Sequence, residues 1–185
     1  MDKPTITAAK AVLAQADCLL TADEVAAAVD RVAAAVNAAL VGQEERPLAL
    51  VLMRGGLIFA GQLLPLLELP VDLDYVDATR YGDATRGGEL QWRMPVPDAV
   101  AGRTVLIVDD VLDEGKTLAA VRAEVLAKGA GRVLIVVFAE KQLGRAKPVS
   151  ADFIGVTLPD RYLFGYGMDV QGLWRNLPAI YALRG

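Results

Sequence analysis

Three aspartates lie at the end of an apolar stretch of the chain. Residues 105–108 are apolar and mostly β-branched, and they are followed by Asp109, Asp110 and, three residues later, Asp113. The next turn, Gly115-Lys116-Thr117, leads into a segment with apolar residues at helical spacing. Carboxylates here can bind hydroxyl groups or a hydrated cation, and the free N–H groups of a helix start favour a phosphate. The aspartates are therefore expected at the carboxyl end of a buried strand, where open α/β sheets bind ligands.

The Gly-Lys-Thr turn is similar to the phosphate loop of ATP-binding proteins, but that motif requires a glycine where this chain has Asp110. Paired acids at a strand end also occur in phosphatases and response regulators, but those sites rarely continue into a phosphate-binding turn. We therefore interpret Asp109 and Asp110 as groups that hold hydroxyls or a hydrated cation. The backbone N–H groups of residues 114–118 and the Thr117 hydroxyl would hold a phosphate. A phosphorylated sugar offers both kinds of group.

The composition excludes several classes of function. The chain has 185 residues, 54% of them hydrophobic, which suits one domain with a sizeable core. It contains no histidine, which rules out Ser-His and Cys-His catalytic groups and histidine-ligated zinc. A net charge of −4 argues against a nucleic-acid partner. No apolar run approaches the roughly 18 residues that span a membrane, and no secretory signal is recognised, so we expect a cytoplasmic protein with no membrane partner.

The apolar pattern predicts an α/β fold. Thr21 to Glu24 matches a capping box, and the valines that follow recur on one face of a helix that ends near Gly42. Continuous apolar runs typical of buried parallel strands cover residues 48–53, 105–108 and 133–138. Helical patterns follow the first two of these runs. Such βαβ units indicate a mostly parallel sheet with right-handed crossovers and helices on its faces.

The remaining segments are expected around this sheet. Residues 71–75 alternate between apolar and acidic, residues 90–94 would return antiparallel to them, and residues 153–158 form a further strand. The three glycines and alternating charges of residues 79–89 indicate a loop that moves. The first twenty residues and the tail complete no βαβ unit, so we expect them to pack together. The single cysteine, Cys18, has apolar neighbours and is expected to be buried and inert.

The stretch from Val105 to Thr117 resembles the phosphoribosyl-diphosphate (PRPP) motif of the type I phosphoribosyltransferases: a hydrophobic strand, two acids, two apolar residues, Asp, any residue, Gly, any residue and Thr. From about Leu48 to Leu177 the chain is similar to the 6-oxopurine branch, the hypoxanthine-guanine phosphoribosyltransferases. The resemblance implies the type I fold, a central mostly parallel sheet flanked by helices, with a small hood subdomain from the chain ends. We expect one domain over 1–185, with a core at about 21–140 and a hood at about 1–20 and 141–185.

The resemblance also implies roles for individual residues. Arg54-Gly55-Gly56 corresponds to the family's Lys/Arg-Gly-Gly turn, and residues 159–166, Pro-Asp-Arg-Tyr-Leu-Phe-Gly-Tyr, mirror its Pro-Asp-Lys-Phe-Val-Val-Gly-Tyr segment. The implied pyrophosphate-binding residues are Arg54, Gly55, Arg80, Tyr81 and Arg175. The ribose and 5′-phosphate would contact Asp109, Asp110, Asp113, Glu114, Gly115, Lys116, Thr117 and Leu118. The purine would contact Lys141, Tyr162 and Leu163, and the cofactor Mg²⁺ would be held by Asp169, Asp109 and Asp110.

These roles imply purine salvage, in which the 5-phosphoribosyl group of PRPP is transferred to hypoxanthine or guanine to give IMP or GMP and pyrophosphate. Asp113 can act on the purine N7 proton as a general base, and Tyr162 can stack on the ring. Lys141 can donate to a 6-oxo group but not usefully to a 6-amino group. Loop 79–89 would close over the site and exclude water. The alternatives are a xanthine/guanine-preferring enzyme, a non-enzymatic PRPP sensor, or an RNA-binding regulator of the pyrimidine-operon attenuator type on the same fold.

Two positions depart from the family pattern. Glu114 stands where Thr or Ser is common, so its charge is expected either to lower the affinity for PRPP or to point outward. Asp109 stands where many relatives have Glu, which shortens its reach to the ribose hydroxyls. The resemblance further implies a non-proline cis peptide between Arg54 and Gly55, and a homodimer or homotetramer.

Overall fold

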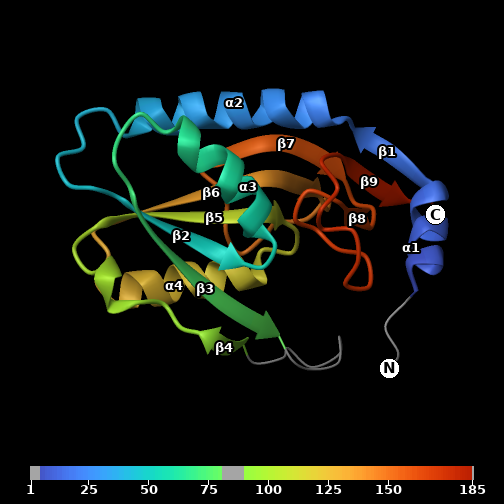
Figure 1. The fold of residues 1–185 in the computed structure, drawn as a ribbon. Coiled ribbons are helices and arrows are strands. Elements are labelled where there is room, and N and C mark those ends of the chain that lie inside the picture. The colour runs from blue at the N-terminus through green and yellow to red at the C-terminus, as the bar shows by residue number, and fades with distance from the viewer. Residues whose placement is uncertain (1–4, 81–89, 185) are drawn as a thin grey trace.

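A six-stranded sheet forms the centre of the computed structural model, which describes residues 5–80 and 90–184 (Figure 1). Its strands are β2 (Leu48–Met53), β3 (Asp72–Arg80), β4 (Leu90–Met94), β5 (Thr104–Leu112), β6 (Arg132–Gln142) and β7 (Phe153–Pro159). They lie in the order β4-β3-β2-β5-β6-β7. All neighbours are parallel except β3 and β4, which are antiparallel. The predicted α/β fold with a mostly parallel sheet is confirmed.

Helices cover both faces of this sheet. Helices α2 (Ala22–Ala39) and α3 (Gly56–Leu63) lie on one face and α4 (Lys116–Ala127) lies on the other (Figure 1). The capping box at the start of α2 is confirmed, because Thr21 Oγ1 accepts from the Glu24 N–H and the Glu24 carboxylate accepts from the Thr21 N–H at 2.8 Å. The helix ends at Ala39, before the expected Gly42. Short 3-10 helices cover Leu64–Leu66 and Asp98–Val100.

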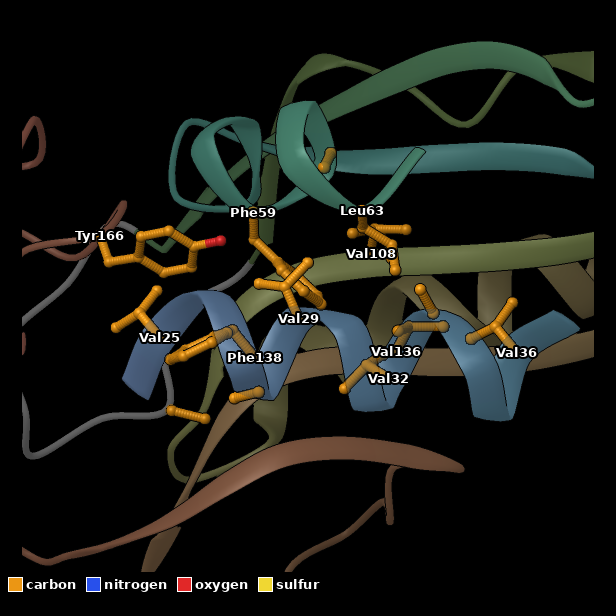
Figure 2. Packing of buried hydrophobic residues seen from close by; sticks show 14 of the residues in the cluster. Val25, Val29, Val32, Val36, Phe59, Leu63, Val108, Val136, Phe138 and Tyr166 are labelled. Carbon is orange, nitrogen blue, oxygen red and sulfur yellow. The ribbon is translucent and has the colours of Figure 1, made fainter. Parts of the chain in front are cut away.

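Alternate residues of the buried strands feed two separate cores. In β5, Leu106 and Val108 point to the α2 and α3 face, whereas Val105 and Ile107 point to α4. The valines of α2 pack on the first face, and Phe138 contacts Phe59 and Tyr166 there with ring centroids at 5.6 and 4.5 Å (Figure 2). With both faces buried, β5 can deliver polar groups only at its end. That end is where the aspartates lie.

The two ends of the chain form a second, smaller sheet beside the carboxyl ends of the central strands (Figure 1). It contains β1 (Ala16–Leu20), β9 (Ile180–Leu183) and β8 (Leu163–Phe164) in that order, all antiparallel. Helix α1 (Ile6–Ala14) precedes it, and the Trp174 indole N–H donates to the Ala9 carbonyl at 2.8 Å. The Asp17 carboxylate pairs with Arg161 and Arg184, which lowers the pKa of Asp17. A hood from the two chain ends is thus confirmed as part of the fold. Its expected range 141–185 is too wide, because β7 lies inside that range and belongs to the central sheet.

Three expectations are wrong in detail. Strand β5 runs from Thr104 to Leu112, beyond the expected 105–108, so Asp109 and Asp110 lie within the strand. Asp109 still pairs with Val137 of β6. Cys18 is exposed, since β1 lies at the edge of the thin hood sheet and not in the core. The non-proline cis peptide joins Met53 to Arg54, one bond before the expected position.

The structure describes only part of the segment that was expected to form a moving loop. Thr79 and Arg80 belong to β3, while residues 81–89 lie outside the described residues. Within the described ranges, no helix is long and apolar enough to cross a membrane.

Candidate active site

Two adjoining cavities lie where β5 and β6 end. One of about 310 Å³ is lined by Leu52, Asp109, Asp110, Val111, Asp113, Glu114, Gly115, Lys116, Thr117 and Leu118. The other, of about 250 Å³, is lined by Asp110, Val111, Asp113, Lys141, Tyr162, Leu163, Met168, Asp169 and Arg175. The cavities share Asp110, Val111 and Asp113. Most of the residues predicted from the sequence therefore converge here, although they are spread over more than sixty positions of the chain.

The first cavity combines a helix start with a hydroxyl group. Helix α4 begins at Lys116 with Gly115 as its N-cap, so the N–H groups of its first turn have no acceptor within the helix. These groups and the positive end of the helix dipole favour an anion, and Thr117 adds a hydroxyl donor. This cavity suits a phosphate group.

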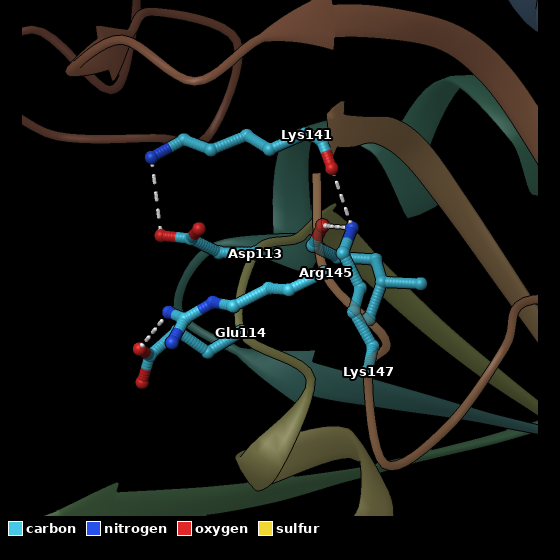
Figure 3. Close-up of polar contacts among 6 residues, drawn as sticks. Asp113, Glu114, Lys141, Arg145 and Lys147 are labelled. Carbon is cyan, nitrogen blue, oxygen red and sulfur yellow. Dashed lines mark hydrogen bonds and ion pairs between the residues drawn. The ribbon is translucent and has the colours of Figure 1, made fainter. Parts of the chain in front are cut away.

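Glu114 is balanced by two cations. Its carboxylate accepts from Arg145 Nη2 at 2.7 Å (Figure 3). It also accepts from Lys116 Nζ at 2.7 Å. The hydrogen bond from Lys116, followed by that from Arg145, lowers the pKa of Glu114. Arg145 lies far along the chain, and nothing in the local motif pointed to it. The charge of Glu114 is thus balanced by two cations, and the three side chains together carry a formal net charge of +1.

In the second cavity the side chains of a lysine and an aspartate face each other. Lys141 Nζ lies 3.1 Å from Asp113 Oδ2 (Figure 3), and the lysine side chain is only 13% exposed. Tyr162 is 53% exposed and Leu163 is buried on β8 beside it. Tyr162 is therefore no core residue, whereas Trp174 is directed to α1 and takes no part in the site. A flat ring could lie against Tyr162 with its polar edge toward Lys141 and Asp113.

Asp109 and Asp110 are carboxylates held in a buried position, 8% and 7% exposed. Burial raises the pKa of both, and the neighbouring charge of Asp110 raises that of Asp109 further. The Asp110 N–H donates to Asp109 Oδ1 at 2.9 Å. Burying two acids side by side is costly unless a cation or hydroxyl donor joins them. The donor set therefore suits a hard cation or the hydroxyls of a sugar.

Asp169 and Arg175 also line the second cavity. Asp169 pairs with Arg175 and accepts from the Gly172 N–H at 2.6 Å, and Arg175 also donates to the Gly167 carbonyl at 2.7 Å. No group of three or more Asp, Glu or Cys side chains converges among the residues described. Mg²⁺ needs no such cage, because it commonly binds one or two carboxylates together with water and substrate phosphates. The residues present fit that mode.

Glycines allow three chain segments to meet beside Asp110. A Cβ on Gly55 would overlap the Asp110 carboxylate, and a Cβ on Gly167 would overlap the Gly55 carbonyl oxygen. Gly167 also has φ of +101°, a conformation that side chains disfavour. Of the predicted pyrophosphate residues, Gly55 and Arg175 reach the site. Arg54 is exposed and lines neither cavity, and Tyr81 and the Arg80 side chain lie outside the described part of the structure.

Three lining residues had no predicted role. Val111 follows Asp110 and lines both cavities, Met168 directly precedes Asp169 and lines the second cavity, and Leu52 of β2 lines the first. Their apolar types carry no chemical signal, and the sequence could have pointed only to Val111 and Met168, which adjoin acids. They supply apolar walls.

A model of the phosphoribosyl transferase domain matches residues 15–171 of the sequence. The chain belongs to the phosphoribosyl transferase family. It is 33% identical over 143 residues to the hypoxanthine-guanine phosphoribosyltransferase of Bacillus subtilis, covering 77% of this chain and 79% of the relative. It is 32% identical over 141 residues to the enzyme of that name from Lactococcus lactis, covering 76% of each.

Solved structures of the family agree with this assignment. A hypoxanthine phosphoribosyltransferase from Staphylococcus aureus has a TM-score of 0.84 at 25% identity and covers 91% of each chain. That of Trypanosoma cruzi has a TM-score of 0.84 at 26% identity, again with 91% of each chain covered. These relatives confirm the family and the type I phosphoribosyltransferase fold that the sequence predicted.

Asp109 should lower the stability of this family member in the absence of ligands. Because burial raises its pKa, the folded chain binds its proton more readily than the unfolded chain does, so ionisation at neutral pH destabilises the fold. Asp109→Asn is expected to raise the free energy of unfolding by about 1 kcal/mol and Tm by about 2–4 °C near neutral pH. The gain should shrink as the pH falls and wild-type Asp109 becomes protonated. Thermal unfolding of both proteins at about pH 8 and about pH 5 measures this gain. An equal difference in Tm between variant and wild type at both pH values would contradict the prediction.

Proposed function

We propose that this protein is a Mg²⁺-dependent purine-salvage enzyme that transfers the 5-phosphoribosyl group from PRPP to hypoxanthine or guanine, giving IMP or GMP and pyrophosphate. The observation that supports it is the pairing of Lys141 with Asp113 across a cavity that opens into a phosphate-binding turn. The names of the relatives point to the same substrates.

The Lys141 and Asp113 pair suits the edge of a 6-oxopurine. Their charged atoms lie 3.1 Å apart, so a ring seated on Tyr162 would meet both at its neighbouring O6 and N7 atoms. Lys141 would donate to O6 and Asp113 would accept the N7 proton. A 6-amino group would face the ammonium with donors, which disfavours adenine.

The remaining groups would serve the sugar and the leaving group. The transfer passes through an oxocarbenium-like state, as sugar transfers generally do. Asp109 and Asp110 would bind the ribose hydroxyls, and the α4 turn would hold the 5′-phosphate. Arg54, Gly55, Arg80, Tyr81 and Arg175 are assigned to pyrophosphate. Bound Mg²⁺, held by Asp169, Asp109 and Asp110 with substrate oxygens, would neutralise charge on the pyrophosphate.

A screen of bases decides this proposal. Hypoxanthine, guanine, xanthine, adenine and uracil are each incubated with PRPP and Mg²⁺, and nucleotide formation is followed by absorbance. We expect IMP and GMP to form at least about 100-fold faster than AMP, because a mismatched buried donor is costly. A preference for xanthine and guanine would favour the alternative enzyme, and AMP or UMP as the main product would reject the role of Lys141.

A regulator that binds RNA is the alternative from another class. Filter binding at rising salt tests it, because a protein that neutralises phosphates loses affinity steeply with salt. We expect no salt-sensitive binding, given the net charge of −4. A PRPP sensor would bind PRPP but form no nucleotide with any base.

We also propose that the protein acts in the cytoplasm as a homodimer or homotetramer. A groove of about 400 Å³ between α3 and β3 is mostly apolar, and its rim exposes Leu57, Leu73 and Tyr75. Such a face is typical of an interface between copies. Light scattering after size exclusion measures the assembly.

A further inference from the structure

Lys147 is a buried lysine that the proposed reaction does not use directly. It lies six residues after Lys141, between β6 and β7, and its side chain is only 9% exposed. Its ammonium donates to the Lys141 carbonyl at 2.6 Å (Figure 3). It also donates to the Leu112 carbonyl at 2.9 Å and to Glu140 Oε1 at 3.1 Å. The three N–H donors of the ammonium thus meet three acceptors, and the Glu140 carboxylate balances the charge.

The acceptors of Lys147 lie where the pairing between strands β5 and β6 ends. The last residue pair in the register of β5 and β6 is Leu112 with Glu140. One residue further on, Lys141 pairs with Leu158 of β7, and Asp113 has left β5. The backbone ladder therefore stops one step short of the two groups that face each other in the cavity.

The Lys147 ammonium joins the two strands just beyond their last paired residues. It binds the carbonyl of Lys141 and the carbonyl of the residue that precedes Asp113. The same segment touches the phosphate turn, because Arg145 pairs with Glu114. A single side chain thus bridges the two strand ends that carry the general base and the purine-reading lysine.

We propose that Lys147 is a positioning residue for the purine base: by joining the ends of β5 and β6, it sets the distance between Asp113 and Lys141 that matches one edge of the purine. This inference rests on the proposed function. It assigns Lys147 no contact with the substrate.

Lys147→Met tests this role, because methionine has a similar length but no donor. We expect the KM for hypoxanthine to rise about tenfold, since two buried carbonyls lose their partner and Lys141 loses its fixed place. The KM for PRPP should change by less than about twofold. Lys147→Gln, which keeps part of the donor capacity, should give a smaller rise and serves if the methionine variant does not fold.

Lys128→Met is the matched control. Lys128 also pairs with an acid, Asp98, at 2.6 Å, but at the far end of α4. Its loss should leave both KM values unchanged.

A second experiment places Lys147→Met in a Lys141→Met background. There it should have no further effect on the KM for hypoxanthine, because the lysine that it positions is gone. A general loss of stability would instead add in both backgrounds.

Hydrogen exchange tests, independently of turnover, whether Lys147 holds the ends of β5 and β6 together. Peptides covering residues 111–115 and 139–143 should exchange faster in Lys147→Met than in wild type or Lys128→Met, and β2 should not change. Unchanged exchange in both peptides, or an equal rise of both KM values, would overturn the proposal. A wild-type protein that transfers ribose phosphate to no purine would refute the proposed function, while the exchange data would still show whether Lys147 joins the strands.

Discussion

Asp113→Asn is expected to lower kcat with hypoxanthine by at least about 100-fold, because an amide cannot take up the N7 proton. Asparagine has the same shape, and its carbonyl oxygen can still accept from Lys141 Nζ, which lies 3.1 Å from the carboxylate. The geometry of the cavity is therefore retained and only the base is lost. Steady-state rates at saturating PRPP and hypoxanthine measure the effect.

The control for this variant is Asp30→Asn on the exposed face of α2, which should leave kcat unchanged. Both proteins should unfold at nearly the same temperature as wild type. If Asp113→Asn turned over at the wild-type rate, Asp113 would not be the general base. The screen of purine and pyrimidine substrates could still show IMP and GMP as the main products in that case. The role of Asp113 and the proposed function are therefore tested separately.

Gly55→Ala is expected to abolish most activity without unfolding the protein. The added Cβ would overlap the Asp110 carboxylate, which must move away from the shared wall of the two cavities. A displacement of about 1 Å in such a group commonly costs about 100-fold in rate. We expect kcat/KM for PRPP to fall at least that far, while Tm falls by no more than about 5 °C, because the clash involves one side chain at the edge of the core.

Gly61→Ala provides the comparison, because Gly61 lies in α3, the helix that Gly55 precedes as its N-cap. A Cβ at Gly61 meets no atom within 4 Å, and alanine favours a helix by roughly 0.5–1 kcal/mol. This variant should be active and slightly more stable. Gly61 also lines the groove between α3 and β3, so light scattering checks that the assembly is unchanged. If Gly55→Ala kept full activity for PRPP, the position of the Asp110 carboxylate would not matter and its assignment to ribose or metal would be wrong.

Much of the site lay within one contiguous stretch and was therefore readable from the sequence. A buried strand, two acids, a tight turn and a helix start follow one another from Val105 to Thr117, and each is specified by local residue types. The resemblance to the PRPP motif rests on that local order. The strands, the capping box and the mostly parallel sheet were predicted for the same reason, since apolar periodicity is a property of neighbouring residues.

The tertiary structure decided which distant residues meet. Lys141 reaches Asp113 across 28 positions because β5 and β6 are adjacent and parallel, and Tyr162 joins them because the chain ends form the hood. One of the two cations that pair with Glu114 is Arg145, which lies 31 positions away. Lys147 looks like any surface lysine in the sequence. It becomes informative only once the sheet places its ammonium where the ladder of β5 and β6 ends, because hydrogen bonds to backbone carbonyls leave no pattern in residue types.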